Sequence, residues 1–222
     1  MSEMHSLDLP LENIVRKGES KAPSIFFLHG FGSNMQDLYG LTPFFPDHWT
    51  CVSLQASIPI YYGGWAWAEL DPNNIGTLPK PEQISKHQEQ INDSINKCID
   101  ELGLLHKKVN LLGFSQGGSI SIYCGLVDPD KFRSVVSLCG FFPSERASEI
   151  VDKNKIKDLK IFMGSGKYDQ IVPLSLSHTT RDGLIGLGLK PNYNEYDSEH
   201  TIPNDCLNEV LSWLKQINEE DG

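Results

Sequence analysis

Short runs of apolar residues alternate along this chain with longer segments in which apolar residues recur every three or four positions. The short runs predict strands, because an apolar run of about four to eight residues suits a strand that is buried on both faces. The longer segments predict amphipathic helices, each with one apolar face toward a core. The predicted strands cover residues 24–28, 51–55, 109–114, 134–138, 160–163 and 192–197, and the predicted helices cover residues 82–102, 173–187 and 203–217.

The order of these elements predicts an α/β fold. Strands that alternate with helices are typical of βαβ units, which build a mostly parallel central sheet with helices on both faces. A length of 222 residues fits one domain, so we expect a single domain over residues 1–222. The longest irregular stretch covers residues 56–80 and is rich in Tyr, Trp, Gly and Pro. Loops of this length are usually lids or binding loops.

Charge and composition narrow the possible partners. The formal net charge is −10, and a surface this negative repels nucleic-acid phosphates and anionic lipid. The N-terminal residues show no secretory signal, and no apolar run approaches the length of a membrane span. The five cysteines are scattered without a C-x-x-C pair, as is typical of buried, reduced thiols. We therefore expect a cytoplasmic monomer or homodimer with a small-molecule substrate, no nucleic-acid partner and no stable membrane insertion.

Residues 113–117 read Gly-Phe-Ser-Gln-Gly, which fits the G-x-S-x-G pattern of a nucleophile elbow. The motif follows a predicted strand and precedes an apolar stretch that can be helical. Glycines two positions either side of Ser115 avoid collisions with neighbouring backbone, and a strained turn pushes the hydroxyl out of the sheet. The N-terminus of the helix that follows favours a developing negative charge. We predict that Ser115 is a nucleophile, and the alternative is a glycine-rich turn that only needs flexibility.

Asp169 and His200 each follow a predicted strand, which is where a parallel sheet carries its catalytic groups. Asp169 comes after residues 160–163 through a glycine-rich turn, and His200 lies between the last predicted strand and the last predicted helix. In a triad, His200 would take the proton of Ser115, while Asp169 would fix the imidazole tautomer and stabilise the imidazolium. The alternatives are an ordinary turn aspartate and a histidine of a surface loop.

The segment His29-Gly30-Phe31-Gly32 follows the first predicted strand, where a hydrolase of this kind supplies an oxyanion donor. We predict that the backbone N–H groups of Phe31 and Gln116 form the oxyanion hole. Each such donor is worth about 3 kcal/mol in the transition state. We interpret His29 as a structural hydrogen-bonding residue. The alternative for the segment is a plain turn after a strand.

With these motifs in place, the chain resembles the phospholipase/carboxylesterase family of α/β hydrolases, which includes the acyl-protein thioesterases. The resemblance rests on LHGFGSN (28–34), LLGFSQGG (111–118), GKYDQIVP (166–173) and EHTIP (199–203), which occur in the family's order. It implies an α/β-hydrolase fold with a minimal cap domain or none, and a serine hydrolase that cleaves esters or thioesters without a cofactor. Many members carry a polar residue before a Trp-Phe pair where this chain reads GGWAW (63–67), so their substrate preference does not carry over. The extra Trp65 indicates a more apolar lid.

Aromatic and apolar residues near the predicted strand ends are candidate walls of a substrate pocket. Four aromatic residues of the 56–80 stretch either form an acyl-chain wall or pack on the core and anchor the loop, and these are Tyr61, Tyr62, Trp65 and Trp67. Further candidates follow two of the predicted strands, and these are Phe141, Phe142, Ile171 and Val172. We predict substrate contacts for Trp65, Trp67, Phe141, Ile171 and Val172.

The predicted function is that of a serine carboxylesterase or thioesterase for small to medium acyl groups, acting through an acyl-enzyme on Ser115. Acyl-protein thioesterase or lysophospholipase activity would use the same chemistry. A non-catalytic ligand-binding protein on a hydrolase scaffold is the alternative from another class, since a fold does not fix a function. No H-E-x-x-H pattern or comparable ligand spacing occurs, so we expect no metal site and no cofactor.

Overall fold

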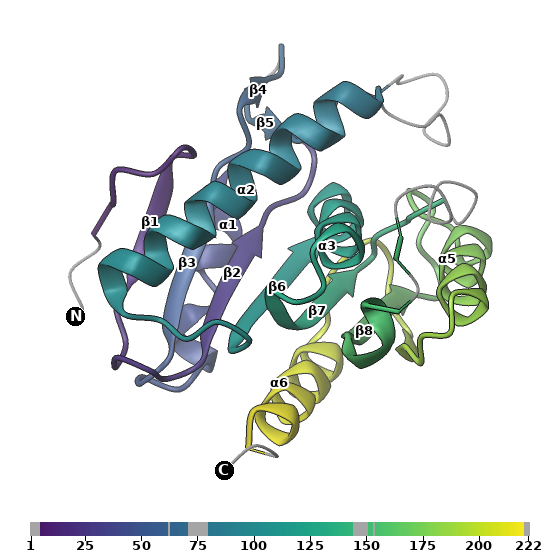
Figure 1. Ribbon diagram of the computed structural model, residues 1–222. Helices are drawn as coiled ribbons and strands as arrows, with labels where there is room; N and C mark the ends of the chain where they lie inside the picture. Colours follow the sequence, from purple (N-terminus) through teal and green to yellow (C-terminus); the bar gives the residue numbers. More distant parts are fainter. Residues whose placement is uncertain (1–4, 62, 71–79, 144–150, 153, 220–222) are drawn as a thin grey trace.

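A seven-stranded sheet with the order β1-β3-β2-β6-β7-β8-β9 carries the fold (Figure 1). The computed structural model describes residues 5–61, 63–70, 80–143, 151–152 and 154–219. The strands are β1 (Asn13–Arg16), β2 (Ser24–Leu28), β3 (Thr50–Leu54), β6 (Val109–Phe114), β7 (Phe132–Leu138), β8 (Lys160–Gly166) and β9 (Asn192–Tyr196). Strand β1 pairs antiparallel with β3, and every other neighbouring pair in this sheet is parallel. The carboxyl ends of the parallel strands therefore meet at one edge of the sheet.

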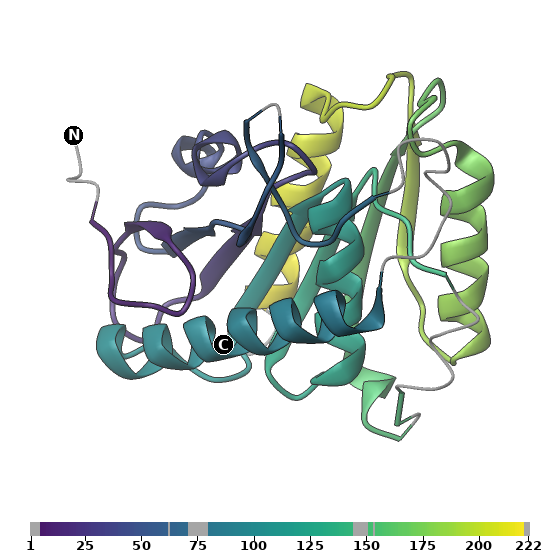
Figure 2. The same ribbon diagram turned by 90° about the horizontal axis from the view of Figure 1, so that it is seen from above.

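Helices cover both faces of the sheet (Figure 2). One face carries α2 (Pro81–Leu102), α3 (Gln116–Val127) and α5 (Leu174–Gly186), and their buried side chains share one apolar core. The opposite face carries α1 (Met35–Tyr39) and α6 (Asn204–Glu219), whose buried residues belong to a second core. The predicted sheet with helices on both faces is confirmed. Burial on both faces explains why strands such as β2 (SIFFL) are continuous apolar runs.

The two long amphipathic helices follow their predicted patterns closely. Helix α2 buries Ile91, Ile95 and Ile99 along one side, begins with Pro81 in its first turn, and ends at Gly103 with a left-handed φ of 66°. Proline suits the first turn because its missing N–H has no partner there, and glycine suits the left-handed end. Helix α6 buries apolar residues at the same spacing, and these are Leu207, Val210, Leu214 and Ile217. Within the described ranges, no helix combines the length and the apolar character needed to cross a lipid bilayer.

Several short elements were not predicted from the sequence. These are β1, α1, the 3-10 turns at Thr42–Phe44 and Ile156–Asp158, and a hairpin of β4 (Ile58–Pro59) with β5 (Trp65–Ala66). The hairpin lies inside the long stretch that was expected to be irregular. The part of that stretch at residues 71–79 lies outside the described residues. All five cysteines are buried and unpaired, as the sequence predicts.

Candidate active site

Ser115 lies between β6 and α3 in a strained backbone conformation. Its φ of 54° and ψ of −120° are unusual for a residue with a side chain, and the surrounding chain enforces them. The Ser115 N–H donates to the carbonyl of Leu138 at 2.8 Å. A Cβ at Gly113 would lie 2.1 Å from the Gly117 oxygen, and a Cβ at Gly117 would lie 1.9 Å from the Leu28 oxygen. The two glycines of the motif are therefore required by backbone contacts, as the sequence pattern implies.

His200 and Asp169 lie beside Ser115 in one hydrogen-bonded chain. The Nε2 atom of His200 is 2.9 Å from the Ser115 Oγ, and its Nδ1 atom is 2.6 Å from the Asp169 Oδ2. An ionised carboxylate only accepts hydrogen bonds, so Nδ1 carries the ring proton and Nε2 is free to accept from the hydroxyl. The structure thus brings together the three side chains that the sequence singled out, from segments 85 and 31 positions apart.

The carboxylate of Asp169 is buried and fixed in place by the backbone that follows it. Its Oδ1 atom accepts hydrogen bonds from the N–H groups of Ile171 and Val172, both at 2.8 Å, which leaves Oδ2 for His200. The loops that carry Asp169 and His200 are in close contact. A Cβ at Gly166 would lie 2.3 Å from the Glu199 oxygen. The structure extends β8 to Gly166, so the glycines that were predicted to form a turn belong to the strand, and the last of them, Gly166, is required by packing against the loop that carries His200.

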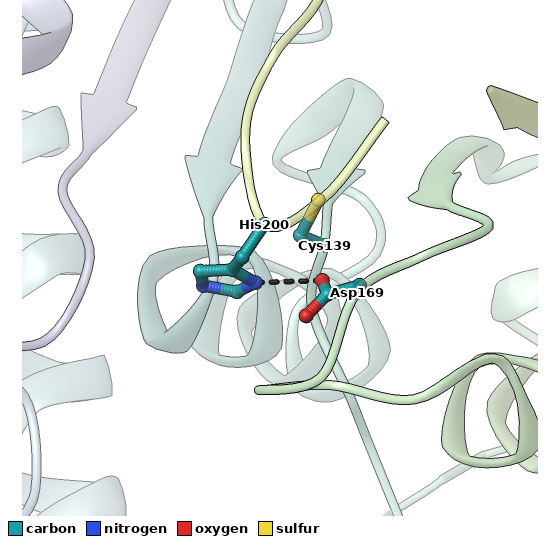
Figure 3. Close-up of side chains that lie close together, drawn as sticks. All are labelled: Cys139, Asp169 and His200. Atoms are coloured by element: carbon teal, nitrogen blue, oxygen red, sulfur yellow. Dashed lines mark hydrogen bonds and ion pairs between the residues drawn. The ribbon is translucent and has the colours of Figure 1, made fainter. Parts of the chain in front are cut away.

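Cys139 lies beside Asp169 and His200, and sequence reasoning missed it (Figure 3). It directly follows β7, is buried, and has a φ of 50°. Its sulfur, a carboxylate oxygen of Asp169 and a ring nitrogen of His200 lie within 4.8 Å of one another, and this set of donor types can bind zinc. Both oxygens of Asp169 and both nitrogens of His200 already have hydrogen-bond partners, however. Burial and the Asp169 charge raise the pKa of the Cys139 thiol to about 12, which favours the neutral thiol.

The predicted oxyanion segment lies directly against the elbow. A Cβ at Gly30 would lie 3.4 Å from the Ser115 Cβ, so the chain that carries Phe31 passes next to Ser115. Gln116 is the first residue of α3, where N–H groups have no partner within the helix. His29 is buried, and its Nε2 accepts from the Ala56 N–H at 3.1 Å, so Nδ1 holds the ring proton and donates to the Gly30 carbonyl at 2.7 Å. Burial lowers the pKa of His29, which agrees with a neutral, structural histidine.

The aromatic residues of the long loop differ in their environments. Trp67 has 0% exposed surface, its Nε1 donates to the His29 carbonyl at 2.8 Å, and its ring lies 5.3 Å from that of His29. This burial favours the loop-anchoring alternative for Trp67 over a pocket wall. Trp65 is half-buried against the core, while Tyr61 is fully exposed. Tyr62 lies outside the described residues.

The remaining pocket candidates divide between exposed and buried side chains. Ile171 is exposed, whereas Val172 is buried next to Asp169. Phe141 is half-buried, and its N–H donates at 3.0 Å to the Oγ of Ser119, which lies one helical turn after Ser115. Phe142 is buried and donates its N–H to the Thr180 Oγ1 at 2.9 Å. Ile171, Phe141 and Trp65 are therefore the candidates with surface available to a substrate.

Comparisons with known proteins agree with this architecture. The model of the phospholipase/carboxylesterase family matches residues 9–218 of the chain. Acyl-protein thioesterase 1 from Mycosarcoma maydis is 26% identical over 208 residues, which cover 85% of each chain. A carboxylesterase from Mesorhizobium loti superimposes with a TM-score of 0.81 at 20% identity, over 96% of this chain and 98% of its own. Esterase PE8 gives a TM-score of 0.78 at 23% identity, over 91% and 97%. At these identities the two structures establish the α/β-hydrolase fold.

Proposed function

Because the chain belongs to the phospholipase/carboxylesterase family, a family of hydrolases, we propose that it is a serine esterase that uses Ser115 as nucleophile. Its substrates would be carboxylic esters or thioesters of small to medium acyl groups. The observation that carries the proposal is the hydrogen-bonded chain from Ser115 through His200 to Asp169, at 2.9 and 2.6 Å. This arrangement fits a serine triad, in which the base reaches the hydroxyl and the acid orients the base.

In the proposed acylation step, the Ser115 oxygen attacks the acyl carbon while His200 Nε2 takes the hydroxyl proton. The buried Asp169 carboxylate stabilises the imidazolium through Nδ1. The backbone N–H groups of Phe31 and Gln116 would bind the oxyanion of the tetrahedral intermediate. When this intermediate collapses, the bond to the alcohol or thiol breaks and His200 returns the proton to the leaving group.

In deacylation, a water molecule takes the place of the leaving group. His200 removes a proton from the water as its oxygen attacks the acyl carbon, and then protonates the Ser115 oxygen as the acid product leaves. These steps use only groups of the chain and water. Addition of a metal chelator is therefore expected to leave the rate unchanged.

Both ester and thioester substrates fit this proposal. The relatives and similar structures include an acyl-protein thioesterase, a carboxylesterase and an esterase, and the same attack cleaves either bond. Trp65, Phe141 and Ile171 have surface that a flexible acyl chain could cover. Lysophospholipase activity would need the same triad and a longer acyl chain.

The proposal is tested with a fluorophosphonate probe, which labels activated serines, and with p-nitrophenyl esters and acyl thioesters of graded chain length. Wild-type protein is expected to be labelled at Ser115 and to hydrolyse short and medium chains. Ser115→Ala should lose labelling and about 10⁴-fold or more of kcat. Ser119→Ala is the matched control, because Ser119 lies one helical turn further and its hydroxyl contacts only the backbone of Ser115 and Phe141 in the described hydrogen bonds. A folded wild-type protein that is neither labelled nor active would refute the proposal.

A further inference from the structure

The side chain of Gln116 makes a pair of hydrogen bonds that the triad does not require. Its Oε1 accepts from the N–H of Trp67 at 2.8 Å, and its Nε2 donates to the carbonyl of Ala68 at 2.8 Å. Gln116 itself is buried, and so are residues 66–68. A carboxamide is suited to this position because it offers an acceptor and a donor side by side, matching consecutive backbone groups.

The segment that Gln116 binds is also attached to the loop that carries Phe31. We call residues 65–68 the clamp segment. Its Trp65 carbonyl accepts from the Gly32 N–H at 2.9 Å, and the Trp65 N–H donates to the Ser33 carbonyl at 2.9 Å. The indole of Trp67 donates to the His29 carbonyl at 2.8 Å. The clamp segment thus binds the residue two positions before Phe31 and the first and second residues after it.

Close backbone contact reinforces this attachment. Gly64, directly before the clamp segment, has a φ of 82°, and a Cβ there would lie 2.0 Å from the Gly32 oxygen. Only glycine allows the hairpin to approach the Phe31 loop so closely. One end of the clamp segment is therefore fixed to the Phe31 loop, and the other end is held by the side chain of Gln116.

We infer that Gln116 has a second role as a positioning residue, in which its carboxamide holds the clamp segment and so sets the spacing between the N–H groups of Phe31 and Gln116. The inference rests on the proposed function, because these two N–H groups are the proposed oxyanion donors. They come from segments far apart in sequence, and both must point at one oxygen atom. Small displacements of such donors reduce the rate strongly, because the stabilisation that they give to the transition state depends on preorganised geometry.

The test uses Gln116→Leu, which keeps the backbone N–H and nearly the side-chain volume but removes both hydrogen bonds of the carboxamide. Gln83→Leu is the matched control, since the Gln83 Oε1 accepts from the N–H of Glu69, just beyond the clamp segment. We expect Gln116→Leu to lower kcat about 10- to 100-fold with little change in KM. Affinity for a trifluoromethyl ketone, which forms an oxyanion when it adds to the serine, should fall by a similar factor. Gln83→Leu should match wild type in both measurements.

Gln116→Asn provides a second variant in case the leucine side chain prevents folding. It keeps an amide that is one methylene too short to reach both partners, and it should show the same joint loss of kcat and ketone affinity. The inference is wrong if a folded Gln116 variant keeps its affinity for the ketone, or if Gln83→Leu loses as much. A wild-type protein without esterase activity would refute the proposed function, whereas active wild type with an equally active Gln116→Leu would refute this inference alone.

Discussion

The two halves of the candidate site are held together by different means. The nucleophile half, formed by β2, β6 and α3, depends on glycines that let backbone segments touch, as at Gly113 and Gly117. The acid–base half, formed by the loops after β8 and β9, depends more on hydrogen bonds of side chains, above all those of Asp169. The close backbone contacts of the first half leave no room for an added side-chain atom, whereas the hydrogen bonds of the second half can be removed one at a time. Substitution of the glycines in the first half should therefore act through folding, whereas removal of a single side-chain hydrogen bond in the second half should act through catalysis.

The largest effect is expected in the nucleophile half for Gly117→Ala. The new Cβ would lie 1.9 Å from the Leu28 oxygen and 2.6 Å from the His29 oxygen. Both oxygens belong to the backbone at the end of β2, which cannot move aside without shifting the strand. We expect the free energy of unfolding to fall by more than ~4 kcal/mol, with activity lost along with the fold. Thermal denaturation followed by circular dichroism measures this. Gly186→Ala, at the end of α5, is the control, because a Cβ there would meet no atom within 4 Å outside the adjoining backbone and should leave the melting temperature close to wild type. If Gly117→Ala has the same melting temperature as wild type, the expected difference between the two halves of the site is wrong.

The next effect is expected in the acid–base half for Asp169→Asn. The asparagine oxygen can still accept from the N–H groups of Ile171 and Val172, but its NH₂ group would face His200 Nδ1 and favour the wrong imidazole tautomer. We expect kcat to fall about 10⁴-fold while the melting temperature changes little. Asp182→Asn, on the exposed side of α5, removes an equivalent charge and should retain full activity. Unfolding of Asp169→Asn under conditions where wild type is stable would contradict the separation of catalysis from folding in this half.

The smallest effect concerns pH, and it involves two buried histidines: His29, which directly follows β2, and His87 of α2, whose ring lies 5.5 Å from that of Trp67. Burial lowers the pKa of both His29 and His87 below the ordinary value of 6.5. Above pH 6.5 the two imidazoles are mainly neutral in both the folded and the unfolded chain. Their protonation therefore does not lower the free energy of unfolding in this range. As the pH falls below 6.5, the unfolded chain takes up protons that the folded chain does not, and the free energy of unfolding decreases. Urea denaturation between pH 7.5 and pH 5.5 should show this loss.

Replacing one of these histidines sharpens the pH prediction. His87→Gln removes one of the two groups and should flatten the dependence of the unfolding free energy on pH below about 6.5. The surface variant His106→Gln should keep the wild-type dependence. If the unfolding free energy of His87→Gln falls with decreasing pH as steeply as that of wild type, the acid destabilisation arises elsewhere in the chain.

The central sheet and the meeting of the three candidate side chains were predictable from the sequence for a physical reason. Strands buried on both faces must be apolar throughout, so β2 and β6 were predicted with the bounds that the structure gives them. Parallel strands bring their carboxyl ends to one edge, so residues that follow β6, β8 and β9 had to lie near one another. The roles assigned to Ser115, Asp169 and His200 remain a proposal until the labelling experiment is done.

Other features left no signal in the local pattern. Strand β1 has only four residues at the sheet edge, and α1 has five, with Leu38 as its buried residue and the Asn34 side chain as its cap. Neither is long enough to show a period. The bonds of Gln116 reach residues 48 and 49 positions away, and Trp67, one of these partners, is fully buried. Such features depend on tertiary packing, which spacing along the chain does not report.

The strand order also has a consequence for how the protein is made. From β2 through β6, β7, β8 and β9, each new strand joins the edge left by the one before it, and β3 and β1 complete the other side from the N-terminal part. As the ribosome releases the chain, starting from its N-terminus, β7, β8 and β9 can be added one after another to the same edge of the sheet. Once β7 has been added, β6, which Ser115 directly follows, is flanked by β2 and β7. The segments that carry Asp169 and His200 are made after the one that carries Ser115. The hydrogen-bonded chain of these three side chains can therefore form only after β8 and β9 have joined the sheet.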